Sequence, residues 1–86
     1  MSQSKSKLQS LIEMYSQLKT EVELVDFLEG IHTPQELESL LVRLDIIKRL
    51  KRNETQRHIA KKLNIGIATV SRGAREIKKG RFKYVK

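Results

Sequence analysis

The 86-residue sequence predicts an all-α fold of about five helices, and three observations carry this prediction. Apolar residues recur every three or four positions through most of the chain, which is the spacing of one face of a helix. The sequence has no long alternation of apolar and polar residues and no Asn-Gly or Asp-Gly pair, so strands and tight hairpins are disfavoured. Helix start and stop signals then divide the chain into segments of helical length.

Two apolar stripes predict two helices at the start of the chain. The first is expected from about residue 6 to 19 and the second from about 21 to 29, either separate or joined through a bend. Gly30 is expected to end the second helix in a left-handed conformation. The stripes consist of Leu8, Leu11, Ile12, Tyr15 and Leu18, and of Val22, Val25 and Leu28.

The run Thr33-Pro34-Gln35-Glu36 predicts the start of a third helix. Threonine caps the first free N–H groups, proline suits the first turn, and glutamate reaches back to the cap backbone. The helix is expected to end near residues 51–53, where basic side chains lie at the negative end of its dipole. Its apolar side is formed by Leu37, Leu40, Leu41, Leu44, Ile47 and Leu50.

The last two helices are predicted on either side of a tight turn. Thr55 is expected to cap the fourth helix, and Asn64 and Gly66 suit the turn because both tolerate left-handed backbone. The fifth helix is expected over residues 67–78, before Gly80. We therefore predict a single domain over residues 1–86, with a helical dimerisation core at 6–52, a helix-turn-helix at 55–78 and a basic-aromatic tail at 80–86.

The composition limits what could stabilise so small a protein. There is no cysteine, so disulfides and cysteine-ligated zinc are excluded, and the two histidines are not spaced as a metal pair. A lone core of this size is marginal, which favours a homodimer. No apolar run reaches the roughly 18 residues of a membrane span, and the start of the chain lacks a signal peptide's apolar region. We expect a soluble, cytoplasmic protein that does not bind membranes.

The positive charge is concentrated in the C-terminal half of the chain. Residues 1–47 hold four basic and eight acidic residues, whereas residues 48–86 hold fourteen basic and two acidic ones. Their net charges are therefore −4 and +12. Such an asymmetry indicates a polyanionic partner for the second half, and the alternative is a solvated basic tail.

Residues 56–77 have the features of a DNA-binding helix-turn-helix, although a generic helical hairpin shares most of them. Ala60 is small enough for close helix contact, Asn64 suits the turn, and Gly73 allows the second helix to approach a neighbour. The start of the last helix would enter the major groove, with Thr69 and Ser71 as polar readers. The residues expected to bind DNA are Gln56, Arg57, Gly66, Ile67, Ala68, Thr69, Ser71 and Lys78, of which Arg57 and Lys78 would pair with phosphates.

The segments 55–57 and 66–73 closely resemble the Trp repressor superfamily, whose DNA-reading core reads Gly-Ile-Ala-Thr-(Ile/Val)-(Ser/Thr)-Arg-Gly. The Thr33-Pro34-x-Glu36 start and the Arg43-Leu44-x-Ile46-Ile47 helix are similar too, and the short ending resembles the YerC/YecD group within that superfamily. The resemblance implies an intertwined homodimer of the Trp repressor type. Its paired reading helices would face successive major grooves about 34 Å apart, on a DNA operator.

The resemblance also implies a small-molecule effector, with L-tryptophan as the corepressor of the family. Arg43 matches a ligand-sandwiching arginine when the alignment is anchored at Thr33, whereas Val42 falls there when it is anchored at Thr55. Glu76 departs from the family's serine, so it could attract an ammonium group, fill the pocket or pair with an arginine. The implied effector residues are Thr33, Arg43, Thr69, Arg72, Gly73 and Glu76; another effector, or none, is the alternative.

We therefore predict a repressor-like transcriptional regulator that binds double-stranded DNA sequence-specifically. The alternatives are an effector-independent DNA-binding regulator, an RNA-binding basic helical module and a module that docks an acidic protein. An enzyme is disfavoured because the sequence has no paired nucleophile and base and no glycine-rich phosphate loop.

Overall fold

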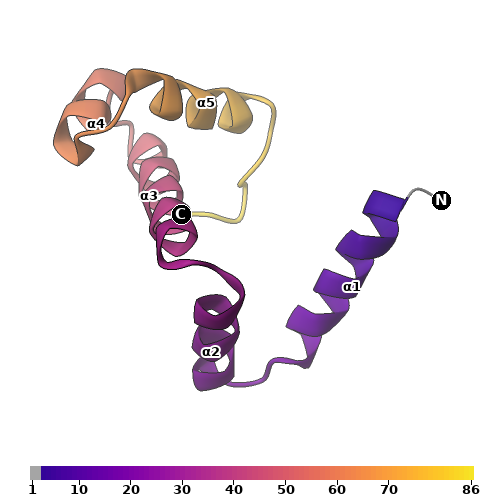
Figure 1. Cartoon of the computed structure of the whole chain (residues 1–86). Coiled ribbons are helices and arrows are strands. Elements are labelled where there is room, and N and C mark those ends of the chain that lie inside the picture. The colour runs from indigo at the N-terminus through magenta and orange to yellow at the C-terminus, as the bar shows by residue number, and fades with distance from the viewer. Residues whose placement is uncertain (1–2) are drawn as a thin grey trace. The chain divides into compact units, whose positions relative to one another are not determined.

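A computed structural model describes residues 3–86 as five α-helices without a strand among them, so the predicted all-α fold is confirmed (Figure 1). The described residues form two compact units, 3–37 and 38–86, which are described separately. In the described part of the chain, no helix is long and apolar enough to cross a membrane. The helices are α1 (Gln3–Gln17), α2 (Glu21–Ile31), α3 (Pro34–Lys51), α4 (Gln56–Leu63) and α5 (Ile67–Lys78).

A capping box at Thr20 separates α1 from α2, so the first two helices are distinct. The Glu23 backbone N–H donates to Thr20 Oγ1 over 3.1 Å, and the Thr20 N–H donates to Glu23 Oε1 over 3.1 Å. The Lys19 N–H donates to the same carboxylate, and these backbone donors hold the pKa of Glu23 below its ordinary value. Sequence reasoning left open a continuous helix because it did not identify this box.

Gly30 does not end α2 as expected, which corrects the prediction of a left-handed cap. The helix continues through Ile31, and the following residue, His32, has an extended backbone with φ −107°. The His32 backbone N–H donates to the Leu28 carbonyl, and its ring Nδ1 lies 2.8 Å from the same oxygen. His32 thus provides the hydrogen-bond partners for a carbonyl at the end of α2, so no residue with positive φ is needed there.

The predicted start of α3 is confirmed in detail. The Glu36 N–H donates to Thr33 Oγ1 over 3.1 Å, and the Thr33 N–H donates to Glu36 Oε1 over 2.8 Å. Pro34 is the first helical residue, where its missing N–H removes no helical hydrogen bond.

The N-terminal unit leaves most of its apolar side chains exposed in the single chain. Helix α2 has no buried residue, and Val22 is 79% exposed. The Tyr15 and Phe27 rings pack edge to face, with 5.3 Å between their centroids. The other exposed large apolar residues of α1 and α2 are Leu8, Leu11, Ile12, Met14, Leu24, Val25 and Ile31.

The C-terminal unit has a small core to which α3, α4 and α5 each contribute one fully packed residue. These residues are Ile46, Ile59 and Val70, and each is at most 2% exposed. Gly73 lies where α5 approaches α3, because a Cβ added there would lie 3.2 Å from Ile46 Cγ2. Val42, Leu50, Ala60, Leu63 and Ile65 pack around this core.

Candidate nucleic-acid interface

Helices α4 and α5 form the predicted helix-turn-helix. Thr55 caps α4 by accepting from the His58 N–H over 3.1 Å. Asn64 has a left-handed backbone with φ 55°, and the Ile65 N–H donates to the Ala60 carbonyl. The chain then leaves the turn extended through Gly66, where α5 begins.

The start of α5 is exposed on the side away from the core. Gly66, Ile67, Ala68 and Thr69 are exposed, whereas Val70 is fully buried. No side chain caps the helix, so its first N–H groups are available to an anion. Apart from Gly66 itself and its two chain neighbours, no described heavy atom lies within 4 Å of a Cβ added at Gly66, so no packing contact within this unit requires a glycine there.

Ser71 and Gln56 are joined by a hydrogen bond between α5 and α4. Ser71 Oγ donates to Gln56 Oε1 over 2.7 Å. The bond fixes the glutamine amide at the start of α4 and leaves its NH₂ group as a donor at the surface. Ser71 is only partly exposed, so its hydroxyl serves this contact within the protein.

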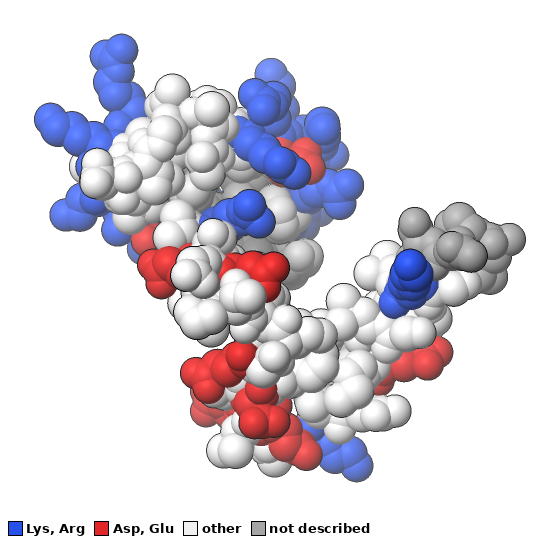
Figure 2. Space-filling model, viewed as in Figure 1, with Lys and Arg blue, Asp and Glu red and all other residues white. Residues whose placement is uncertain are grey.

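The cationic side chains lie at the surface of the same unit. Arg57 is exposed in the first turn of α4, and Lys78 is exposed at the last residue of α5. Figure 2 shows Lys and Arg side chains gathered over α4 and α5, whereas Asp and Glu predominate among the charged side chains drawn for residues 6–37. The positive charge and the exposed start of α5 therefore belong to the same folded unit, residues 38–86.

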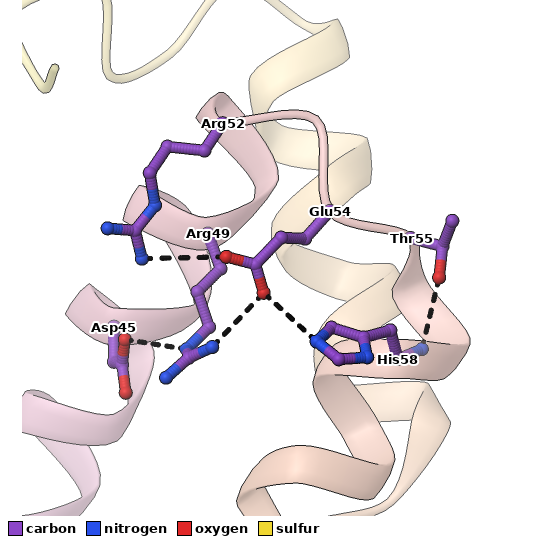
Figure 3. Close-up of polar contacts among 6 residues, drawn as sticks. All are labelled: Asp45, Arg49, Arg52, Glu54, Thr55 and His58. Atoms are coloured by element: carbon purple, nitrogen blue, oxygen red, sulfur yellow. Dashed lines mark hydrogen bonds and ion pairs between the residues drawn. The ribbon is translucent and has the colours of Figure 1, made fainter.

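A network of ion pairs links the end of α3 to the start of α4 (Figure 3). Arg49 lies 3.0 Å from Asp45 and 3.1 Å from Glu54. The Glu54 carboxylate also lies 3.6 Å from Arg52 Nη2 and 3.7 Å from His58 Nε2. The hydrogen bond that Arg49 donates to Glu54, more than the one it donates to Asp45, raises the pKa of Arg49. Glu54 was not singled out from the sequence, although it is the one acid between Lys48 and Gly73.

A cleft of about 430 Å³ lies between α3, α5 and the C-terminal tail. It brings together five of the six residues implied to bind an effector: Arg43, Thr69, Arg72, Gly73 and Glu76. Arg43 lines the cleft, whereas Val42 packs on the core, so the structure matches the alignment anchored at Thr33. Thr33 caps α3 in the other unit and is not a lining residue. The remaining lining residues are Ile46, Ile47, Ala68 and Phe82.

Glu76, the residue that departs from the family pattern, is paired at both carboxylate oxygens. Lys79 Nζ lies 3.2 Å from Oε2, and Arg81 Nε lies 3.3 Å from Oε1. The hydrogen bond from Lys79, followed by the charges of Lys79, Arg81 and Arg72, holds the pKa of Glu76 below its ordinary value. The carboxylate therefore remains ionised at neutral pH, with two cations already bound.

Comparison with known proteins identifies the family. Residues 6–86 match the family model described as Trp repressor protein. The chain belongs to this family. The Trp repressor family is a family of transcription regulators, which supports the predicted DNA-binding, repressor-like regulator.

Similar proteins include Trp operon repressor homologs of Vibrio and Photobacterium species. The homolog of Vibrio cholerae serotype O1 is 34% identical over 74 residues, which cover 85% of this chain and 72% of the relative. The homolog of Photobacterium profundum is 34% identical over 71 residues, and that of Vibrio campbellii is 47% identical over 47 residues. The last alignment covers 54% of this chain and 47% of the relative. No solved structure gives a significant match.

Phe82 is one of four cleft residues that sequence reasoning did not assign to an effector in this Trp repressor family member. The sequence places both Phe82 and Tyr84 in the basic-aromatic tail at 80–86 and does not distinguish them. The structure separates them, because Phe82 lines the cleft whereas Tyr84 is 81% exposed. The only signal in the sequence was an aromatic residue two positions after the helix-ending Gly80.

Proposed function

We propose that this protein is a dimeric, repressor-like regulator that binds double-stranded DNA sequence-specifically through the start of α5. The observation that carries the proposal is Gly66, whose backbone is open and has no steric reason within its unit to be glycine. A helix start in which Gly66, Ala68 and Thr69 are small lets the backbone come close to base edges.

Base recognition is assigned to the exposed residues that follow the glycine. The Thr69 hydroxyl can exchange hydrogen bonds with base edges, and the Ile67 side chain, which is 50% exposed, can contact a thymine methyl group. Arg57 and Lys78, at the start of α4 and the end of α5, are assigned to phosphates, and Gln56 is held by Ser71 for a polar contact.

The exposed apolar residues of α1 and α2 support dimerisation. Soluble monomers seldom expose apolar patches this extensive, and a second copy of the chain would cover them. A two-fold dimer would place two copies of α5 one turn of DNA apart, about 34 Å, on a pseudo-palindromic operator. Analytical ultracentrifugation tests this step, and a monomer at micromolar concentration would contradict it.

The experiment for DNA recognition is selection of bound duplexes from a random pool, followed by affinity measurements across a salt series. Thr69→Ala should reduce discrimination between selected and scrambled duplexes by about 1–3 kcal/mol. Arg57→Ala should weaken binding to the selected and the scrambled duplex alike. It should also reduce the slope of log affinity against log salt concentration by about one unit. Equal effects from the two substitutions would contradict these roles, and tighter binding to structured RNA in matched salt would favour an RNA-binding module.

We further propose that a small effector binds in the cleft, because five of the implied residues line it together. Some members of the family are named Trp operon repressor homologs, which makes L-tryptophan the first candidate. Calorimetric titration of the free protein tests this point. Specific DNA binding that no aromatic acid alters would instead indicate an effector-independent regulator.

A further inference from the structure

The ion-pair network at the corner between α3 and α4 takes no part in the proposed DNA contacts (Figure 3). Its central residue is Glu54, which lies between the end of α3 and Thr55, the N-cap of α4. Glu54 is the one acidic residue between Lys48 and Gly73. A lone acid in so basic a segment weakens the attraction to a polyanion, so its charge does not serve DNA affinity directly.

Both the backbone and the side chain of Glu54 bind Arg49 of α3. The Glu54 N–H donates to the Arg49 carbonyl over 3.1 Å, and Arg49 Nη1 donates to Glu54 Oε1 over 3.1 Å. Asn53 has a left-handed backbone with φ 66°, and its N–H donates to the Leu50 carbonyl. The two backbone bonds form a Schellman motif, which closes the end of α3 and sets the direction in which the chain continues.

The Glu54 carboxylate also reaches the first turn of α4. Its Oε1 lies 3.7 Å from His58 Nε2, and its Oε2 lies 3.6 Å from Arg52 Nη2. The Arg49 and Glu54 side chains are 20% and 24% exposed, whereas those of Arg52 and His58 are 60% and 59% exposed. Exposed ion pairs contribute little, and removing one partner of a largely covered pair leaves the other charge uncompensated. The pair between Arg49 and Glu54 is therefore the strongest link of the network across the corner.

Arg49 has a second carboxylate partner, which does not cross the corner. Arg49 Nε donates to Asp45 Oδ1 over 3.0 Å, and both residues lie on α3. Loss of the Asp45 carboxylate would leave the link between α3 and α4 in place, whereas loss of the Glu54 carboxylate would remove its side-chain part. The chain thus contains a matched pair of carboxylates on one arginine.

The hydrophobic core does not by itself fix the angle between α3 and the last two helices. Its fully packed residues are only Ile46, Ile59 and Val70, one from each helix. Apolar contact is non-directional, so it holds the helices together without strongly restricting their angle. Hydrogen bonds are directional, and those that join Glu54 to Arg49 restrict the angle at the corner.

We propose that Glu54 is a positioning residue that fixes the direction of α4 and α5 relative to α3, and thereby the half-site spacing that a dimer accepts. This inference rests on the proposed function as a dimeric DNA-binding regulator. The hydrogen bond from Ser71 to Gln56 joins α5 to α4, so a change of angle at the corner would move both helices together. Two reading helices bind one duplex at the same time only if their separation, about 34 Å, matches the half-sites.

The test measures binding of the full chain to a series of duplexes by fluorescence anisotropy. The series contains a duplex selected from a random pool, the same duplex with one base pair inserted or removed between its half-sites, and a single half-site. The unsubstituted protein should bind the selected spacing at least about tenfold more tightly than either altered spacing. Glu54→Gln should lower this spacing ratio at least about threefold and change the affinity for the single half-site less than about twofold, because each helix-turn-helix stays intact.

Asp45→Asn is the matched control, because it removes the other carboxylate from Arg49. It should leave the spacing ratio unchanged. Arg49→Gln should lower the ratio as much as Glu54→Gln does, and the double substitution should lower it no further, since both remove the same link. Glu54→Asp keeps the charge but shortens the side chain, so it should act like Glu54→Gln and replaces it if the glutamine variant does not fold.

A spacing ratio that Glu54→Gln leaves unchanged would overturn the proposal, and so would equal effects of Glu54→Gln and Asp45→Asn. Equal losses on the single half-site and on the selected duplex would also overturn it, because they would show a general loss of structure. If the unsubstituted protein binds DNA without any preference for spacing, the proposed dimeric function fails and this inference fails with it. If that preference exists and Glu54→Gln retains it, only this inference fails.

Discussion

Gly66→Ala is expected to separate the stability of the fold from DNA binding. The Gly66 backbone, with φ −67° and ψ 143°, lies in a region that alanine adopts without strain. Apart from Gly66 itself and its two chain neighbours, no described heavy atom lies within 4 Å of the added methyl group. Alanine is a poorer helix cap than glycine by roughly 0.5 kcal/mol, and it lowers the entropy of the unfolded chain by about as much. The free energy of unfolding should therefore change by less than about 0.5 kcal/mol.

The effect on DNA binding should be large, because the methyl group projects where the backbone is proposed to approach the bases. Crowding a close-packed contact by one methyl group costs about 1–3 kcal/mol, which is a roughly 5- to 150-fold loss of affinity. Urea denaturation measures the free energy of unfolding, and fluorescence anisotropy with a selected duplex measures the DNA affinity.

Gly30→Ala is the matched control. A Cβ added at Gly30 also has no described atom within 4 Å, but this glycine lies inside α2. Alanine should stabilise the helix by about 0.5–1 kcal/mol and leave DNA affinity unchanged. Wild-type DNA affinity in Gly66→Ala would refute the proposed approach of the backbone, and a loss of more than about 2 kcal/mol in stability would refute the structural reasoning.

Three further substitutions test the core and the helix caps. Gly73→Ala should destabilise the protein by roughly 1 kcal/mol, because crowding against the stiff Ile46 Cγ2 at 3.2 Å exceeds the gain in helix propensity; a more stable variant in urea denaturation would contradict the close approach. Ile59→Ala, at a position with no exposed area, should cost about 2–5 kcal/mol in the same assay, and a smaller cost would show that the core collapses around the cavity. Backbone and side-chain bonds from Thr33 lower the pKa of Glu36, so its contribution to stability is present above pH 4.5 and is lost as the pH falls through the lowered value. Glu36→Gln keeps a capping acceptor and should make the melting temperature less dependent on acid pH, whereas an unchanged profile would assign the acid sensitivity to other carboxylates.

Elements set by interactions within a few residues were predictable from the sequence. Thr33 and Thr55 mark helix starts because their hydroxyls bind N–H groups three residues later, and Asn64 marks the turn because it tolerates positive φ. The same reasoning predicted that Gly30 ends α2, and this prediction was wrong. A histidine two residues later satisfies the helix end, and no sequence rule gives that side chain priority over a glycine.

The cleft depended on contacts that the sequence does not display. Arg43, Arg72 and Glu76 were expected near a ligand through family resemblance, and their grouping follows from Gly73, which lets α5 lie close to α3. The position of Phe82 depends on Lys51, 31 residues away, and on a left-handed backbone in a residue type that seldom adopts it. Neither the contact with Lys51 nor the left-handed backbone of Phe82 is indicated by the residues near position 82.

Thr69 and Ala68 connect the two proposed sites, because both are exposed at the DNA-reading end of α5 and both line the cleft. A ligand that packs in the cleft would therefore contact the first turn of α5, which is the turn proposed to approach the bases. Thermodynamic linkage requires the effect to be mutual: a ligand that raises DNA affinity by some factor must itself bind the DNA complex more tightly by that factor. Because Gly73 packs directly on the buried Ile46, α5 has little freedom to slide along α3, so coupling is expected through tilting of its N-terminal turn. The ligand should consequently alter discrimination at the bases read by Thr69 and leave the salt slope set by Arg57 and Lys78 unchanged.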